Sequence, residues 1–193
     1  MLLVLVAGYC LWPRSPSLSA FDPKKMAQLQ MAVWKDAAGK NRRGVILSLH
    51  KIFEGQFRIP PVASLAMAFE TSRALTIFYA APDAADQEKA LVPLEAVFSR
   101  LQNATESKYS AHAAARLALM IWTLRADHAN RGQLASAWAD LIGLLYGRPA
   151  ADAIPTAKLF AQVAKLADEG KWDDAQESAS IAWAAVKSLS SAP

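Results

Sequence analysis

Two segments of the chain match each other at an offset of 88 residues, and this match constrains the fold more than any other feature. The segments are Phe21–Trp34 (FDPKKMAQLQMAVW) and Tyr109–Trp122 (YSAHAAARLALMIW), and 122 − 34 = 88. Each begins with an aromatic residue and ends with tryptophan. If the two segments form equivalent first helices, Trp34 and Trp122 should be matched, partly buried anchors of the core.

Further matches follow in the same order along the chain. Arg43-Gly44 matches Arg131-Gly132 at an offset of 88, and Phe57-x-x-Pro60 matches Tyr146-x-x-Pro149 at an offset of 89. Chance rarely produces such an ordered set. We therefore interpret the chain as two tandem pseudo-repeats of about 88 residues.

Apolar residues at helical spacing predict about eight helices and no strand of useful length. Asp22 and Pro23 have the types preferred at the N-cap and first position of a helix, and this first helix should stop near Gly39. A third helix begins at Pro61 and carries the apolar set Val62, Leu65, Phe69 and Phe78. The fold class is thus all-α, with αα-hairpins packed as a bundle or a solenoid.

The domain organisation follows from the repeat. Residues 1–20 form an apolar segment and a linker, residues 21–102 the first repeat, residues 103–108 a polar linker, and residues 109–190 the second repeat. Pro93 lies within the expected fourth helix and should either kink it or mark its true start. Trp138, in the sixth expected helix, is a further structural anchor.

The segment Met1–Trp12 is apolar throughout, and four interpretations of it remain open. It is too short to span a bilayer, which takes about 20 residues. It has the length of a signal-peptide core but lacks the positive charges that precede such a core. A lipoprotein signal is disfavoured, because the bulky Tyr9 directly precedes Cys10. A membrane anchor with an incomplete start, leaving the globular part in the cytoplasm, is the interpretation we favour. The fourth is a helix packed on the domain or a partner.

Positive charge gathers in the first repeat. Residues 22–58 hold eight basic and three acidic side chains, a balance of 8 − 3 = +5. The loop Gly39–Gly44 is basic and precedes a helix, so Lys40, Arg42 and Arg43 are candidates for contact with a phosphate or an anionic lipid. An exposed loop without a ligand is the alternative. Nucleic acid is not expected as a partner, because the aromatic residues fall on inward faces and not among the lysines.

The sequence contains none of the usual catalytic patterns. There is no Gly-x-Ser-x-Gly turn, no phosphate-binding glycine loop and no Glu-x-x-His element, and Cys10 is the only cysteine. His50 and Glu54 are one helical turn apart, but no second element of a metal site accompanies them. We expect no catalytic residues, no metal and no cofactor, and we lean against an enzyme.

The opening Phe21-Asp22-Pro23, followed by Leu29 and Trp34, resembles a group of uncharacterised bacterial all-helical proteins of similar length, often with an apolar N-terminus. The resemblance would cover residues 21–190. It implies an acidic residue after the leucine, where this chain has Gln30, with Ala118 at the counterpart. Any role of that acid in the group would be lost here.

Three functions remain in competition, and the third of them is a helical enzyme without a recognisable motif. The first is a membrane-associated, non-catalytic interaction or assembly module in a bacterium, with a protein partner and a membrane surface; export through an N-terminal signal is the alternative location. The second is a protein that binds a small ligand or an anionic lipid in the groove between the two repeats. A deep apolar pocket between the repeats with a polar cluster favours the second, and a flat exposed apolar patch favours the first.

Overall fold

The computed structural model describes residues 15–127 and 131–191, and all regular structure in these ranges is helical. The all-α fold class is therefore confirmed. The main helices are α2 (Pro23–Ala38), α3 (Arg42–Lys51), α4 (Pro61–Ala80), α6 (Leu91–Thr105), α7 (Ala111–Ala126), α8 (Arg131–Tyr146), α9 (Ala150–Asp168) and α10 (Trp172–Ser191). A π-helical turn (Ile52–Gln56) extends α3, and α5 (Ala84–Gln87) with a 3₁₀ turn (Glu88–Ala90) precedes α6.

The helices begin where the sequence predicts. Asp22 caps α2 by accepting a hydrogen bond from the Lys25 backbone N–H at 2.7 Å, and Pro23 is the first helical residue. Ser110 caps α7 in the same way through the Ala113 N–H at 3.2 Å. Pro93 is the third residue of α6, so it marks the start of that helix and does not kink it.

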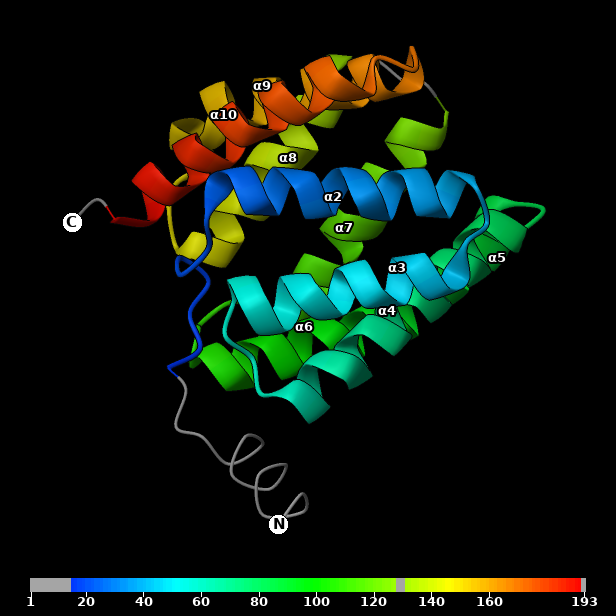
Figure 1. Cartoon of the computed structure of the whole chain (residues 1–193), viewed down its shortest axis with the longest axis horizontal. Coiled ribbons are helices and arrows are strands. Elements are labelled where there is room, and N and C mark those ends of the chain that lie inside the picture. Colours follow the sequence, from blue (N-terminus) through cyan, green and yellow to red (C-terminus); the bar gives the residue numbers. More distant parts are fainter. Residues whose placement is uncertain (1–14, 128–130, 192–193) are drawn as a thin grey trace.

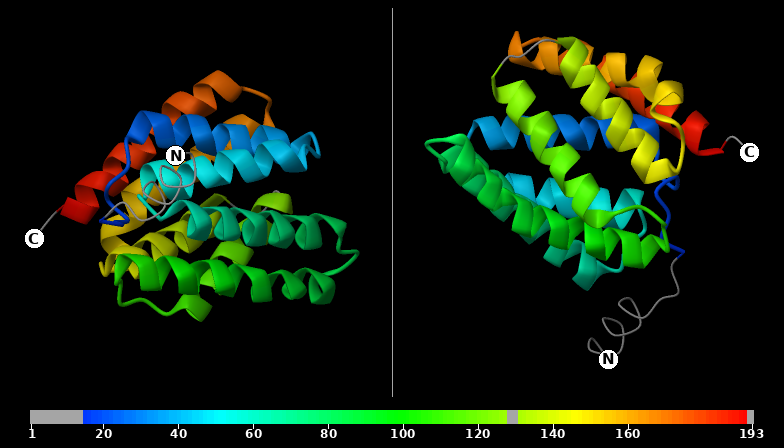
Figure 2. Two further views of the ribbon diagram at one scale, coloured as in Figure 1. Left: turned by 60° about the horizontal axis from the view of Figure 1, so that its bottom comes forward. Right: turned by 180° about the vertical axis from the view of Figure 1, so that it is seen from behind.

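The eight main helices form a closed ring. Each contacts the next along the chain, from α2 through α3, α4, α6, α7, α8 and α9 to α10, and α10 contacts α2. Figure 1 shows α2 lying between α10 and α3. Seen from behind (Figure 2, right), α7 crosses between the side formed by α4 and α6 and the side formed by α8 and α9. The arrangement is therefore a bundle and not an open solenoid.

The two halves of the ring have matching helix bounds. Helices α2 and α7 each contain 16 residues, and their first residues are 111 − 23 = 88 apart. Pro60 and Pro149 both precede the third helix of their half, and the turns before them carry a positive φ at Arg58 and Gly147. An origin of the halves in one duplicated unit stays a prediction.

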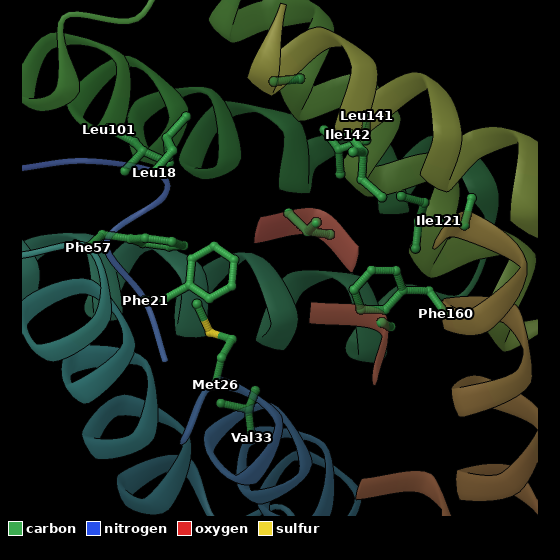
Figure 3. Close-up of a cluster of buried hydrophobic side chains, with 14 of the residues drawn as sticks. Leu18, Phe21, Met26, Val33, Phe57, Leu101, Ile121, Leu141, Ile142 and Phe160 are labelled. Atoms are coloured by element: carbon green, nitrogen blue, oxygen red, sulfur yellow. The ribbon is translucent and has the colours of Figure 1, made fainter. Parts of the chain in front are cut away.

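The core runs through both halves. Its members include residues before α2, from the first half and from the second half, and Figure 3 labels ten of them: Leu18, Phe21, Met26, Val33, Phe57, Leu101, Ile121, Leu141, Ile142 and Phe160. Phe21 packs edge-on against Phe57 with ring centroids 6.3 Å apart. Edge-to-face pairs are a favoured aromatic geometry, so these contacts fix how the first helix enters the ring.

Helix α4 does not bury the apolar set that its sequence suggests. Phe78 is buried, but Val62, Leu65 and Phe69 are exposed at 72%, 42% and 49%. The buried face consists mostly of small residues, including Ser64, Ala68, Ser72 and Ala74. Apolar residues occupy every face of α4, so the periodicity alone does not select the inner face. The face with small side chains is the buried one, because small side chains let α4 approach α3 and α6 closely.

Two other expectations need qualification. The polar segment expected as a linker from Asn103 starts inside α6, which continues to Thr105. The apolar segment Met1–Trp12, which includes Cys10, lies outside the described residues. Of the expected segment 1–20, the structure describes only the linker residues 15–20. Within the described ranges, no helix combines the length and the apolar character needed to cross a bilayer.

The buried phenol of Tyr109 predicts a pH dependence of stability. Burial raises its pKa above the usual value of about 10, and its hydroxyl donates to the Phe98 carbonyl at 3.0 Å. The unfolded chain loses this proton above about pH 10 while the folded chain keeps it, so the group's contribution to stability is constant below that pH and declines above it.

We expect Tyr109→Phe to lower the free energy of unfolding at pH 7 by about 1 kcal/mol, through the lost hydrogen bond. Above about pH 10 the variant should lose stability less steeply than the original chain. Urea denaturation from pH 7 to 11 measures both effects. If the free energy of unfolding falls equally steeply above pH 10 in both proteins, the raised pKa of Tyr109 does not cause the decline.

Candidate functional site

A cavity of about 800 Å³ lies inside the ring and is the candidate site. Helices from both halves form its wall: α2, α3 and α4 from the first, and α7, α8, α9 and the start of α10 from the second. A smaller hollow of about 410 Å³ lies between α8 and α9, with Arg131 and Lys158 at its wall. The central cavity is the better candidate because it alone of these two combines aromatic side chains with charged groups.

Four tryptophans line the cavity. Trp34, Trp122, Trp138 and Trp172 are each half-buried and come from α2, α7, α8 and the first position of α10. The first three were expected as anchors of the core, and they do pack against it. Each therefore contacts the core and also presents apolar surface to the cavity.

The wall positions of the two halves pair at the spacing of the repeat. At an offset of 88, Gln30 pairs with Ala118, Val33 with Ile121, Trp34 with Trp122, and Ala37 with Arg125. At an offset of 89, Leu49 pairs with Trp138, Ile52 with Leu141, Leu75 with Ala164, and Tyr79 with Asp168. Charge breaks this correspondence, because Arg125 and Asp168 have uncharged counterparts in Ala37 and Tyr79.

Arg125 is the centre of a polar cluster in the wall. Its guanidinium lies over the Trp34 ring at 3.6 Å from the ring centroid, a stacked cation–π geometry. It forms an ion pair with Asp168 at 3.6 Å, and Arg131 reaches the other oxygen of the same carboxylate at 3.2 Å. Burial lowers the pKa of Arg125, and Asp168 opposes this change.

Lys40 is the one member of the expected basic loop that lines the cavity. It is exposed, as are Tyr79 and Ala126, so these three residues mark the mouth. Arg42 and Arg43 are exposed and do not appear in the wall. The structure thus brings only part of the predicted anion site to the cavity.

The helix start behind that loop already has a capping group. The Asn41 side chain accepts from the Gly44 backbone N–H at 3.1 Å and donates to Asp36 at 2.7 Å. The Asn41 side chain thus already accepts from the Gly44 N–H, a backbone donor at this helix start that a phosphate would otherwise use.

His50 belongs to a polar group that joins α3 to α4. Its Nδ1 lies 2.7 Å from the Ser64 hydroxyl, and its Nε2 lies 3.0 Å from the Glu54 carboxylate. Serine, histidine and a carboxylate in this order resemble a nucleophilic triad. Ser64 has no exposed surface, however, so a substrate could not reach its hydroxyl and the group acts as a structural link.

Residues 15–127 and 131–191 contain no cluster of histidine, cysteine and carboxylate side chains suited to a metal ion. His112 pairs with Glu95 at 3.1 Å on the surface, and His128 lies outside those ranges.

Arg125 and Asp168 are not among the residues predicted from the sequence. They lie 43 residues apart on different helices, and neither belongs to a motif. One signal was available: in the aligned halves, Arg125 replaces an alanine three positions after the matched tryptophan.

We expect Asp168→Asn to lower the free energy of unfolding by about 1–3 kcal/mol, because two guanidinium groups then lose their shared carboxylate in a partly buried position. The neighbouring Glu169, which pairs with Lys171 on the surface, provides the control. Glu169→Gln should leave the urea midpoint unchanged. Equal urea midpoints for Asp168→Asn and Glu169→Gln would mean that the ion pairs of Asp168 do not contribute to stability.

Comparisons with protein-family models, curated proteins and solved structures find no match to this chain. The resemblance carried by Phe21-Asp22-Pro23 and Trp34 therefore stays a prediction. The function has to be argued from the geometry of the cavity.

Proposed function

We propose that this protein binds a small, largely apolar ligand in the cavity inside its ring. The observation that carries the proposal is a cavity of about 800 Å³ walled by four tryptophans. Ligand sites of proteins have volumes of about 300–1,000 Å³ and are lined mainly by apolar and aromatic side chains with a few polar groups. Both the size and the composition of this cavity fit that description.

The cavity belongs to the folded chain itself. Its wall comes from helices that each contact two neighbouring helices of the ring. Buried residues such as Val33, Ile121 and Leu134 form the deep part of the cavity. A preformed site binds without an ordering cost for the protein, which favours a small ligand.

The proposal predicts that a neutral apolar dye, N-phenyl-1-naphthylamine, binds with one molecule per chain and gains fluorescence. Leu75→Trp enlarges a side chain of α4 that lines the cavity, so it should abolish the gain. Leu65→Trp makes the same change on the exposed face of the same helix and should leave it intact. Both variants should keep the far-ultraviolet circular dichroism of the original chain.

If the dye does not bind, or if both tryptophan variants bind it equally, the cavity is not the site. Equal loss in both variants would likewise remove the assignment to the inner face of α4.

A second function, association with a membrane surface and a protein partner there, rests on a different observation. Val62, Leu65 and Phe69 lie at helical spacing on α4 and expose a continuous apolar stripe on the first half. The Ser17 backbone N–H donates to the Phe57 carbonyl at 3.1 Å, so the described chain begins close to the start of α4.

This candidate predicts that the full chain co-sediments with phosphatidylglycerol vesicles and that Leu65→Glu with Phe69→Glu weakens the binding several-fold, because charge enters the apolar contact. A double variant on the exposed surface of the other half, Ile154→Glu with Ile181→Glu, is the control and should bind normally. Unchanged binding of the α4 variant would exclude the stripe as the contact.

A further inference from the structure

We infer that the ligand of the cavity is an amphipathic monoanion, a carboxylate on an apolar body, whose charged group binds Arg125. This inference rests on the proposed ligand-binding function and adds the chemical class and the orientation of the ligand.

The charges around the cavity do not balance. The described wall contains two cations, Lys40 and Arg125, and one anion, Asp168. That anion is shared, because Arg131 also pairs with it from outside the wall at 3.2 Å. The local sum is therefore positive, and in a partly buried site a ligand anion is the group that would compensate it.

Two charged side chains of α2, Asp36 and Lys35, have opposite signs and leave the sum of the wall charges unchanged. On α2, the Asp36 carboxylate accepts from Asn41 at 2.7 Å, behind the loop. Lys35, also on α2, lies over the Trp172 ring with its Nζ 5.3 Å from the ring centroid and adds a third cation near the wall. A cationic ligand would thus meet repulsion at this end of the cavity.

The orientation of Arg125 suits a carboxylate. Trp34 covers one face of the guanidinium, and the side chain is held between that ring and Asp168. A stacked guanidinium keeps its donors in one plane at its edge, and this edge matches the two oxygens of a carboxylate. Lysine, as a point charge, cannot reproduce that geometry.

The same geometry orients the ligand. Arg125 lies next to the exposed Ala126 at the mouth, together with Lys40 and Tyr79. The deep wall is apolar, with Ile121, Leu134 and Leu141. The charged group would therefore stay near the mouth, and the apolar body would extend inward between Trp122 and Trp138.

A matched series of ligands tests this inference: decanoate, 1-decanol and decylammonium, which share one chain length and differ in charge. Each is titrated below its micelle concentration against the full chain carrying N-phenyl-1-naphthylamine, and displacement is followed by the dye's fluorescence. We expect decanoate to bind about tenfold or more tightly than decanol, because charge-assisted hydrogen bonds to Arg125 add to the apolar contact. Decylammonium should bind most weakly.

Two arginine variants locate the effect. In Arg125→Gln the preference for decanoate over decanol should fall to near one while the decanol affinity is kept, and Arg125→Lys should restore part of the preference. Arg131→Gln leaves the two cations and the one anion of the wall in place, so it should reduce the preference much less than Arg125→Gln does. If Arg125→Gln fails to bind decanol, Arg125→Lys decides, since its decanol affinity should be normal and its preference reduced.

The results separate the two proposals. If the dye and all three ligands fail to bind the original chain, the ligand-binding function itself is wrong. If decanol binds as tightly as decanoate, the cavity binds apolar molecules but the anion inference is overturned. A preference for decanoate that survives in both Arg125 variants would also overturn it.

Discussion

The contact between α2 and α10 joins the two ends of the described chain, and the ring depends on it. Phe21 packs edge-on against Trp183 with ring centroids 5.3 Å apart, and the Trp183 Nε1–H donates to the Gln30 side chain at 2.7 Å. Lys187 donates to the Phe21 carbonyl at 2.8 Å. Without these contacts the helices would form an open row, and the cavity would lose the wall that α2 supplies.

Much of the helical framework was predictable because its signals are local. Asp22 and Pro23 set the start of α2 through backbone geometry that neighbouring residues determine. The inner face of α4 was not predictable from periodicity, since apolar side chains surround this helix. The choice of Ser64 and Ala68 over Leu65 and Phe69 depends on how closely α3 and α6 approach, which is a property of the assembled ring.

The candidate site divides in the same way. Trp34 and Trp122 were identified from the sequence because tryptophans at matched positions of the two halves indicate partly buried anchors, and Trp138 was identified as a further anchor. The charged cluster was not identified, since Arg125 and Asp168 meet only when the ring has brought α7 and α9 to the wall of one cavity. The basic loop gave a partly useful signal: Lys40 reaches the cavity, while Arg42 and Arg43 remain on the outer surface.

The ring closure also sets the order in which the cavity can form. Gln30 and Trp183 are 183 − 30 = 153 residues apart, so their hydrogen bond joins two helices that are far apart along the chain, α2 and α10. Contacts of such long sequence separation are slow to form and come late in folding. During synthesis α2 emerges from the ribosome long before α10, and the wall stays incomplete until α10 has emerged and packed on α2. A ligand that requires the closed cavity would bind only chains in which α10 has packed on α2 and would stabilise them selectively through mass action.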